Sequence, residues 1–284
     1  VNETFTRITG YTHEESIGRS PRILKSGIQA QEFYDAMWQS LLQNGFWYGE
    51  LWNRGKHGEL YAALTNITAV CDAAGKTQNY VALFTDITQM KAYQRQLEHV
   101  AHYDALTGLP NRVLLADRLQ RAMIQSERRG LSVAVLYLDL DGFKPVNDRF
   151  DHGVGDRLLV AIAQSMKEAL RDGDTISRIG GDEFVAVLVD LDQEQDCFPV
   201  LERLLEAASS PFFIDGNRLQ VSASIGVTFF PRDSVDADQL MRHADQAMYQ
   251  AKQAGKNRYH LFDTEKNRRT ASRTKSAHRV ARAL

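Results

Sequence analysis

One stretch of sequence decides the fold: Arg178-Ile179-Gly180-Gly181-Asp182-Glu183-Phe184. Two successive glycines allow a tight hairpin turn because glycine adopts positive φ angles without steric cost. The apolar run over residues 185–189 then continues as a strand. Carboxylates at such a tip, here Asp182 and Glu183, suit a divalent cation held against a phosphate, since hard cations prefer oxygen ligands. Alone, the stretch is equally compatible with a plain turn.

A second acidic cluster lies upstream, where Asp139-Leu140-Asp141 follows an apolar run. Residues 132–140 are predicted to form a strand that is buried on both faces. Gly142 lets the chain turn after it, and an acidic pair at the carboxyl end of a strand suits a metal site in an open α/β sheet. The alternative, a solvated strand end, stays open for this pair by itself.

Strands alternate with helices around these two clusters, which predicts a sheet covered by helices over residues 103–263. The predicted helices are 111–129, 156–170, 198–208 and 237–254, and the predicted strands are 132–140, 175–179, 183–189, 218–229 and 258–262.

Residues 1–88 are predicted to form a separate, small α+β domain with strands at 47–53, 60–70 and 80–86. A helix over 89–102 follows, with Thr88 as its N-cap. Its apolar residues have a/d spacing and are Met90, Tyr93, Leu97 and Val100. Packing on its own domain and pairing with a second helix are both open.

Composition narrows the function. The 284 residues carry a net charge of -2, so no basic excess points to nucleic acid. No apolar run reaches membrane-spanning length. Two distant cysteines, Cys71 and Cys197, predict a reducing, cytoplasmic environment. The chain begins at Val1 in mid-pattern, and we expect it to be a fragment of a longer protein. Residues 264–284 are basic and predicted to be a tail or a linker to a further domain.

Polar residues suited to a nucleotide follow the first acidic cluster. Lys144 offers a point charge to phosphate, and a glycine-bearing helix start offers free N–H groups. Asn147 and Asp156 suit a guanine edge, because an amide meets O6 or N7 and a carboxylate accepts from N1–H and N2–H. Helix capping is the alternative role of Asp156.

Together these motifs resemble the GGDEF family of diguanylate cyclases over nearly all of residues 103–262. The matching segments are Asp139-x-Asp141-x-Phe143-Lys144-x-x-Asn147-Asp148, His152-x-x-Gly155-Asp156, Gly180-Gly181-Asp182-Glu183-Phe184, and the flanking stretches 104–112 and 245–257. The resemblance implies a palm-like α/β fold related to nucleotidyl cyclases. It also implies the condensation of two GTP molecules into cyclic di-GMP and pyrophosphate by two domains that meet face to face.

The resemblance also assigns roles to residues. Asp139 and Asp182 would bind Mg²⁺ or Mn²⁺ with the Leu140 carbonyl, Glu183 would assist, and Asp182 would be the base for the ribose 3′-hydroxyl. The nucleotide contacts implied are Asn147 and Asp156 to guanine, His152 near the nucleotide, and Lys144, Lys252 and Lys256 to phosphates, with Lys144 also counted as catalytic. Product dimers would bind an inhibitory site made of Arg171, Asp174 and Arg178.

Two positions depart from the family pattern. Asp151 stands where glycine is usual, which adds negative charge near the triphosphate and is expected to weaken GTP binding. Lys256 stands where arginine is frequent, so a bidentate phosphate contact becomes a point contact. Neither change removes a catalytic group, so the sequence predicts an active enzyme. A degenerate domain that binds GTP or cyclic di-GMP as a regulator is the alternative.

The first domain resembles a PAS sensor domain that lacks its first strand. The matching segments are Ile8-Thr9-Gly10-Tyr11, Trp52-Asn53-Arg54 and Asp86-Ile87-Thr88. The second of these is similar to flavin-binding PAS domains, so bound FAD and an empty domain used for dimerisation are both open. Ser20-Pro21 replaces the cysteine of light sensors. The helix 89–102 would couple sensor to cyclase in a homodimer, and residues 278–284 faintly resemble the entry to an EAL phosphodiesterase domain.

Overall fold

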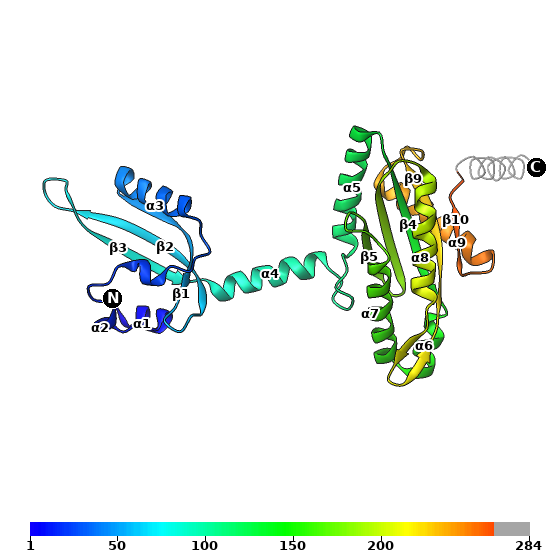
Figure 1. Cartoon of the computed structure of the whole chain (residues 1–284), viewed down its shortest axis with the longest axis horizontal. Coiled ribbons are helices and arrows are strands. Elements are labelled where there is room, and N and C mark those ends of the chain that lie inside the picture. The colour runs from blue at the N-terminus through cyan, green and yellow to red at the C-terminus, as the bar shows by residue number, and fades with distance from the viewer. Residues whose placement is uncertain (264–284) are drawn as a thin grey trace, which may run out of the picture. The chain divides into compact units, whose positions relative to one another are not determined.

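A computed structural model describes residues 1–263 as two compact units, the first ending at Glu98 and the second beginning at His99. Each unit combines a largely antiparallel sheet with helices (Figure 1). This confirms the predicted α+β class. The basic tail and the resemblance over 278–284 lie outside the described residues. Within residues 1–263 there is no helix with the length and apolar character of a membrane span.

The first unit is built on a three-stranded antiparallel sheet in the order β1-β2-β3. Its strands are β1 (Phe46–Arg54), β2 (Leu60–Cys71) and β3 (Thr77–Asp86). Its helices are α1 (Glu3–Thr9), α2 (His13–Ser16), the 3₁₀ turn η1 (Pro21–Leu24) and α3 (Gln31–Asn44). The buried apolar residues include Met37 and Leu41 of α3 and Tyr61 and Ala63 of β2.

Helix α4 (Thr88–His102) begins at Thr88, so this residue is not the predicted N-cap. The backbone N–H of Thr88 donates to Asp86 Oδ1 at 2.8 Å. Asp86 thereby accepts one of the N–H groups at the start of the helix that have no partner within the helix. The a/d residues of α4 are 56–70% exposed. The apolar stripe therefore does not pack against the described part of the chain.

The second unit has a five-stranded sheet in the order β10-β9-β4-β6-β5, in which only the β10–β9 pair is parallel. The strands are β4 (Ser132–Asp141), β5 (Thr175–Gly180), β6 (Glu183–Leu191), β9 (Ser222–Phe230) and β10 (Arg258–Leu261). The helices are α5 (Arg112–Arg129), α6 (Phe143–Phe150), α7 (His152–Glu168), α8 (Phe198–Ser209) and α9 (Ala237–Gln253). A 3₁₀ turn, η2 (Glu194–Cys197), and a small hairpin, β7 (Phe212–Ile214) with β8 (Asn217–Leu219), complete it.

Two predicted elements differ from the structure. The strand expected over 218–229 divides into β8 and β9, and α7 begins one turn earlier than expected, at His152. Helix α6 occupies a segment for which no helix or strand was predicted. Pro145 lies in its first turn, where a missing N–H costs nothing, so proline did not prevent a helix here.

The central strand β4 alternates its side chains between two cores. Ala134, Leu136 and Leu138 join the larger core, to which α7 and α8 contribute. Val133 and Val135 join the smaller one with residues of α5 and α9, and Tyr137 packs against it. Side chains two residues apart lie on the same face of a strand. Tyr137 and Asp139 therefore lie on the same face of β4 as Val133 and Val135, nearer the carboxyl end of the strand.

Helix α9 lies directly on β9 at Gly226. A Cβ atom there would come within 1.9 Å of the Ala244 carbonyl oxygen and 2.1 Å of the Met248 nitrogen. Both are backbone atoms, which cannot rotate away. The absence of a side chain at this position therefore fixes how close α9 comes to the sheet.

We expect Gly226→Ala to destabilise the second unit by about 1–3 kcal/mol or more, because overpacking forces backbone shifts. Hydrogen exchange of peptides from β9 and α9 would measure the loss of protection. Gly173→Ala is the matched control, since its Cβ would meet Val189 at an ordinary 3.6 Å. Equal protection in both variants would contradict this packing argument.

Candidate nucleotide and metal site

Two acidic residues face each other across neighbouring strands. Asp139 of β4 and Glu183 of β6 are direct partners in the antiparallel register. Asp182 occupies the turn just before β6, and its carbonyl oxygen accepts the Leu140 N–H at 3.2 Å. The structure thus brings the four residues of the predicted metal site together, at the carboxyl end of β4 and the start of β6.

The hairpin tip that carries Asp182 is held by Arg178. Its guanidinium donates to the Gly181 carbonyl oxygen at 2.9 and 2.8 Å and to both oxygens of Asp104 at 2.9 and 3.1 Å. Gly181 has a φ of 53°, a value that glycine adopts without strain. Arg178 therefore links the glycine turn to the loop that precedes α5.

The site carries an excess of negative charge. Lys252, in the last turn of α9, forms an ion pair with Asp139 (Nζ to Oδ1, 2.6 Å). Burial raises the pKa of Asp139, the Lys252 contact opposes this, and the charges of Asp182 and Glu183 add to the rise. Three carboxylates against one close lysine are suited to a divalent cation.

The acidic residues do not form a complete metal cage. Within residues 1–263, no group of three or more His, Cys, Asp or Glu side chains is arranged to hold a metal ion. Mg²⁺ is commonly held by one or two carboxylates together with substrate phosphates. The donor set here fits that kind of site.

Asp141 serves a different purpose from Asp139. Its buried carboxylate accepts from the hydroxyls of Ser222 and Ser224 and from the backbone N–H of Asn257, at 3.0–3.2 Å. It thus fastens the end of β4 to β9 and to the segment after α9. The second acid of the predicted pair therefore has a structural role here.

The residues predicted to read guanine lie on consecutive helices, Asn147 on α6 and Asp156 on α7. The Asn147 Oδ1 atom is buried and has no hydrogen-bond partner. It packs so close to Gly155 that a Cβ there would lie 1.8 Å away. An unsatisfied buried oxygen is unfavourable unless something supplies a donor, and a guanine N–H is such a donor. Asp156 is exposed.

The remaining predicted nucleotide contacts are on the surface. Lys144 and His152 lie in the first turns of α6 and α7 and are exposed. Lys256 is exposed too, beyond the end of α9, and has a φ of 61°. Of the three predicted phosphate-binding lysines, only Lys252 lies against the acidic cluster, through its contact with Asp139.

Asp151 joins α6 to α7 in an unusual conformation, with φ 115° and ψ 168°. This region is almost reserved for glycine and costs a non-glycine residue about 1–3 kcal/mol. The Asp151 carboxylate accepts the Val154 N–H at 2.9 Å and so caps α7. The negative charge of Asp151 therefore lies at the N-terminus of α7, where it is favourable. This interaction offsets part of the backbone strain at Asp151.

The predicted inhibitory residues separate into two places. Arg171 pairs with Asp174 at 3.4 Å and also donates to the Val189 carbonyl oxygen. The Asp174 side chain is 2% exposed and accepts the Val189 N–H at 3.2 Å. Arg178 is engaged elsewhere, with Gly181 and Asp104, so the structure brings only two of the three together.

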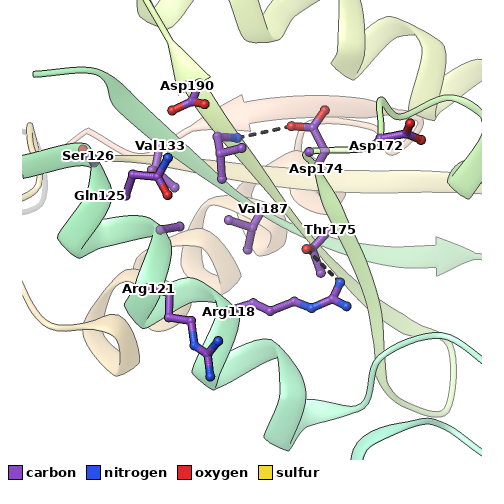
Figure 2. Close-up of a pocket in the computed structure, with 13 residues that line it drawn as sticks. Arg118, Arg121, Gln125, Ser126, Val133, Asp172, Asp174, Thr175, Val187 and Asp190 are labelled. Carbon is purple, nitrogen blue, oxygen red and sulfur yellow. Dashed lines mark hydrogen bonds between the residues drawn. The ribbon is translucent and has the colours of Figure 1, made fainter. Parts of the chain in front are cut away.

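A cavity of about 320 Å³ opens beside Asp174, between α5 and the β5–β6 hairpin (Figure 2). Arg118 and Arg121 of α5 line it, and Arg118 Nη1 donates to Thr175 Oγ1 at 3.2 Å. Sequence reasoning missed these arginines. Their spacing of three along a helix was the available signal, because it puts them on one face.

Tyr137 is a second residue that sequence reasoning missed. Its hydroxyl donates to Glu183 Oε2 at 3.1 Å. Burial, and then the Glu183 charge, raise the pKa of Tyr137 well above its ordinary value, so the phenol stays a donor. Its position two residues before Asp139 was the signal, since both lie on one face of β4.

Comparison with known proteins agrees with this geometry. The family model described as "Diguanylate cyclase, GGDEF domain" matches residues 101–258. The chain belongs to the GGDEF family. A PAS domain model matches residues 1–89, which confirms the predicted order of a PAS domain followed by a GGDEF domain. GGDEF diguanylate cyclases generally use Mg²⁺ or Mn²⁺.

Two relatives are longer proteins from Pseudomonas aeruginosa. The bifunctional diguanylate cyclase/cyclic di-GMP phosphodiesterase MucR is 40% identical over 197 residues, which cover 69% of this chain and 29% of MucR. The cyclic di-GMP phosphodiesterase NbdA is 33% identical over 217 residues, covering 73% of this chain and 28% of NbdA. This GGDEF chain spans less than a third of either relative.

Among solved structures, the GGDEF domain of TpbB (YfiN) from Pseudomonas aeruginosa superposes with a TM-score of 0.57 at 34% identity. The match covers 60% of this chain and 99% of that one.

The Arg178–Asp104 link predicts a pH dependence of stability. Burial alone would raise the pKa of Asp104, but hydrogen bonds from Thr107 and the Arg178 guanidinium outweigh burial and lower it. A lowered pKa gives stability that is present above the unfolded value, near 3.9, and lost as pH falls through the folded value.

We therefore expect Asp104→Asn to destabilise the GGDEF domain by about 1–2 kcal/mol at pH 7. The difference from the unmodified chain should shrink as pH drops below about 4. Urea denaturation followed by circular dichroism measures both. Asp117→Asn, which breaks an exposed pair with Arg121, should have little effect at any pH. A difference in stability between Asp104→Asn and the unmodified chain that does not change with pH would contradict a stabilising role of the ionised Asp104 carboxylate.

Proposed function

We propose that this chain is an active diguanylate cyclase, which condenses two GTP molecules into cyclic di-GMP and pyrophosphate in the cytoplasm. The observation that carries the proposal is the acidic cluster. Asp139 and Glu183 are opposite each other on β4 and β6, Asp182 is next to Glu183 in the turn, and Lys252 contacts Asp139. A domain that had lost the reaction would be expected to lack at least one of these acids.

The chemistry follows from the roles of these groups. Asp182 accepts the proton of a ribose 3′-hydroxyl, whose oxygen attacks the α-phosphorus of the other GTP. The bond from that phosphorus to pyrophosphate breaks, and a second transfer in the opposite sense closes the ring. A divalent cation bound by Asp139, Asp182 and the Leu140 carbonyl supplies charge neutralisation at the phosphate. Lys144, Lys252 and Lys256 bind phosphates.

Guanine selectivity is assigned to Asn147 and Asp156. The buried Asn147 oxygen without a partner accepts a guanine N–H. The Asp156 carboxylate accepts from N1–H and N2–H, whereas adenine has an acceptor at N1 and no amino group at C2. His152 lies at the start of the same helix as Asp156, beside the proposed base site.

The test is direct. The chain is incubated with GTP and Mg²⁺, and cyclic di-GMP is measured by chromatography. We expect product, and a loss of at least about 100-fold for Asp182→Ala, because even groups that only support a metal ligand contribute 10–100-fold. Asp117→Ala is the control for removal of an exposed carboxylate. No product from the unmodified chain contradicts the proposal.

A second candidate is a regulator that binds cyclic di-GMP, favoured by the cavity beside Asp174. It combines a buried carboxylate with Arg118 and Arg121, the groups that suit guanine N–H atoms and phosphate. Calorimetric binding of cyclic di-GMP that is lost in Asp174→Ala, together with an absence of product from GTP, would favour this candidate over the enzyme. The same site could also carry product inhibition through Arg171, with Arg178 as the predicted third member.

We also propose a homodimer formed through the PAS domain and α4. Exposed apolar residues on β1 and β3 share one face of the PAS sheet, because Phe46 and Val81 both pair with Thr68 and Tyr48 and Leu83 both pair with Asn66. Lys91 of α4 pairs with Glu50 of β1 at 2.7 Å, on this same face. Met90, Tyr93 and Leu97 of the α4 stripe are exposed as well.

Leu97→Lys should weaken that dimer by roughly 100-fold or more, since each buried leucine contributes about 1.5–3 kcal/mol and two are lost per dimer. Light scattering at several concentrations would measure the change, and cyclase activity should fall with it. Gln96→Lys, which adds the same charge at an exposed neighbouring position, is the control. A Leu97→Lys chain that dimerises normally would rule out α4 as the contact.

The PAS domain either binds FAD or acts without a cofactor. Trp52 and Arg54, of the flavin-like segment, are tied to Ser26, whose hydroxyl donates to the Trp52 carbonyl oxygen at 2.6 Å and whose carbonyl accepts from Arg54 at 2.9 Å. A visible absorption spectrum of the purified chain decides between the two. Flavin bands, with the released cofactor identified as FAD by chromatography, support the first alternative, and a spectrum without flavin bands supports the second.

A further inference from the structure

Among the side chains that the structure describes, only that of Tyr137 forms a hydrogen bond to the Glu183 carboxylate, which it meets through Oε2 at 3.1 Å. Tyr137 lies two residues before Asp139 on β4, and Glu183 is the direct partner of Asp139 on β6. The tyrosine therefore lies beneath the acidic cluster on the α5 and α9 side of the sheet, where its ring packs against the smaller core.

The donor in this contact is rigid and the acceptor is not. Tyr137 belongs to a central strand that has a partner strand on both sides, where it lies opposite Val185 of β6 and Gly226 of β9, and its ring is half-buried. A glutamate side chain has several rotatable bonds and loses entropy when it is fixed. One hydrogen bond to Oε2 restricts the carboxylate and leaves Oε1 without that constraint.

The other carboxylate of the facing pair is held by a different group, since Asp139 pairs with Lys252. The two acids are thus oriented independently, one by a cation from α9 and the other by a neutral donor from β4. A neutral donor leaves the negative charge of Glu183 in place for a cation, whereas a lysine would offset it.

We infer that Tyr137 is a positioning residue, whose hydroxyl fixes the Glu183 carboxylate so that its second oxygen stays directed to the divalent cation of the acidic cluster. The aromatic ring is sufficient for packing against the smaller core, because a phenylalanine ring would fill the same space. Packing therefore does not require the hydroxyl. The inference rests on the proposed function, in that it takes the acidic cluster to be the site of Mg²⁺ or Mn²⁺. Groups that orient metal ligands in this way contribute about 10–100-fold to metal affinity or activity.

The experiment measures metal binding directly. Free Mn²⁺ is followed by electron paramagnetic resonance while the full chain, saturated with 3′-deoxy-GTP, is titrated. This nucleotide lacks the attacking hydroxyl, so no reaction occurs. Four chains are compared: unmodified, Tyr137→Phe, Glu183→Ala and the double variant. We expect about 10-fold weaker Mn²⁺ binding for Tyr137→Phe, and no further loss when it is added to Glu183→Ala.

The double variant separates positioning from a general effect on folding, because a residue that acts only through Glu183 has no effect once Glu183 is gone. Tyr259→Phe removes a phenol hydroxyl from β10 and should leave Mn²⁺ affinity unchanged. Unchanged affinity in Tyr137→Phe overturns the inference. So does a loss that adds fully to that of Glu183→Ala, or a Tyr259→Phe effect of the same size.

The outcome is independent of turnover. If the chain makes no cyclic di-GMP but Mn²⁺ binding depends on Tyr137 through Glu183, the enzyme proposal fails and the positioning role stands. If cyclic di-GMP is made and Tyr137→Phe neither weakens Mn²⁺ binding nor raises the Mg²⁺ concentration for half-maximal activity, the enzyme proposal stands and the positioning role fails.

Discussion

The register of β4 against β6 is the constraint on which the rest of the site depends. It places Asp139 opposite Glu183, and the turn that precedes β6 places Asp182 beside them. A shift of one residue would move every side chain of a strand to the opposite face of the sheet. Asp139 would then face the larger core, where Leu138 and Leu140 now lie. The buried rows of both strands resist such a shift, so the apolar core sets the position of the acids.

Several contacts of the GGDEF domain oppose the cost of that arrangement. Three carboxylates at the same end of neighbouring strands repel each other, and the charges of Asp182 and Glu183 add to the rise in the pKa of Asp139 that burial causes. Lys252 contacts Asp139 from the last turn of α9, the helix that lies directly on Gly226 of β9. Arg178 fixes the turn that carries Asp182 by binding both the Gly181 carbonyl and Asp104. An unfavourable cluster held by surrounding structure is typical of a functional site.

The predicted guanine-binding residues and the predicted inhibitory site also combine local strain with burial. Asp151 has a backbone conformation that is almost reserved for glycine, and its side chain caps α7. Asn147 keeps a buried oxygen without a partner. The cavity beside Asp174 is lined by Arg118 and Arg121 of α5, a helix that contains none of the predicted inhibitory residues. In the first unit, apolar residues on β1, β3 and α4 are exposed.

The sequence by itself determined the order of the domains, most of the strands and helices, and the acids of the cluster. Those features are local: a two-residue period, a glycine turn and a motif of fixed spacing are written in neighbouring residues. It did not determine α6, because the pattern of polar residues around Pro145 also suits a loop. Only the tertiary structure decided that Tyr137 meets Glu183, that Arg178 meets Asp104 and that Asp141 meets Ser224. These partners are 46 to 83 residues apart in the chain, and only strand pairing and helix packing bring them within hydrogen-bonding distance.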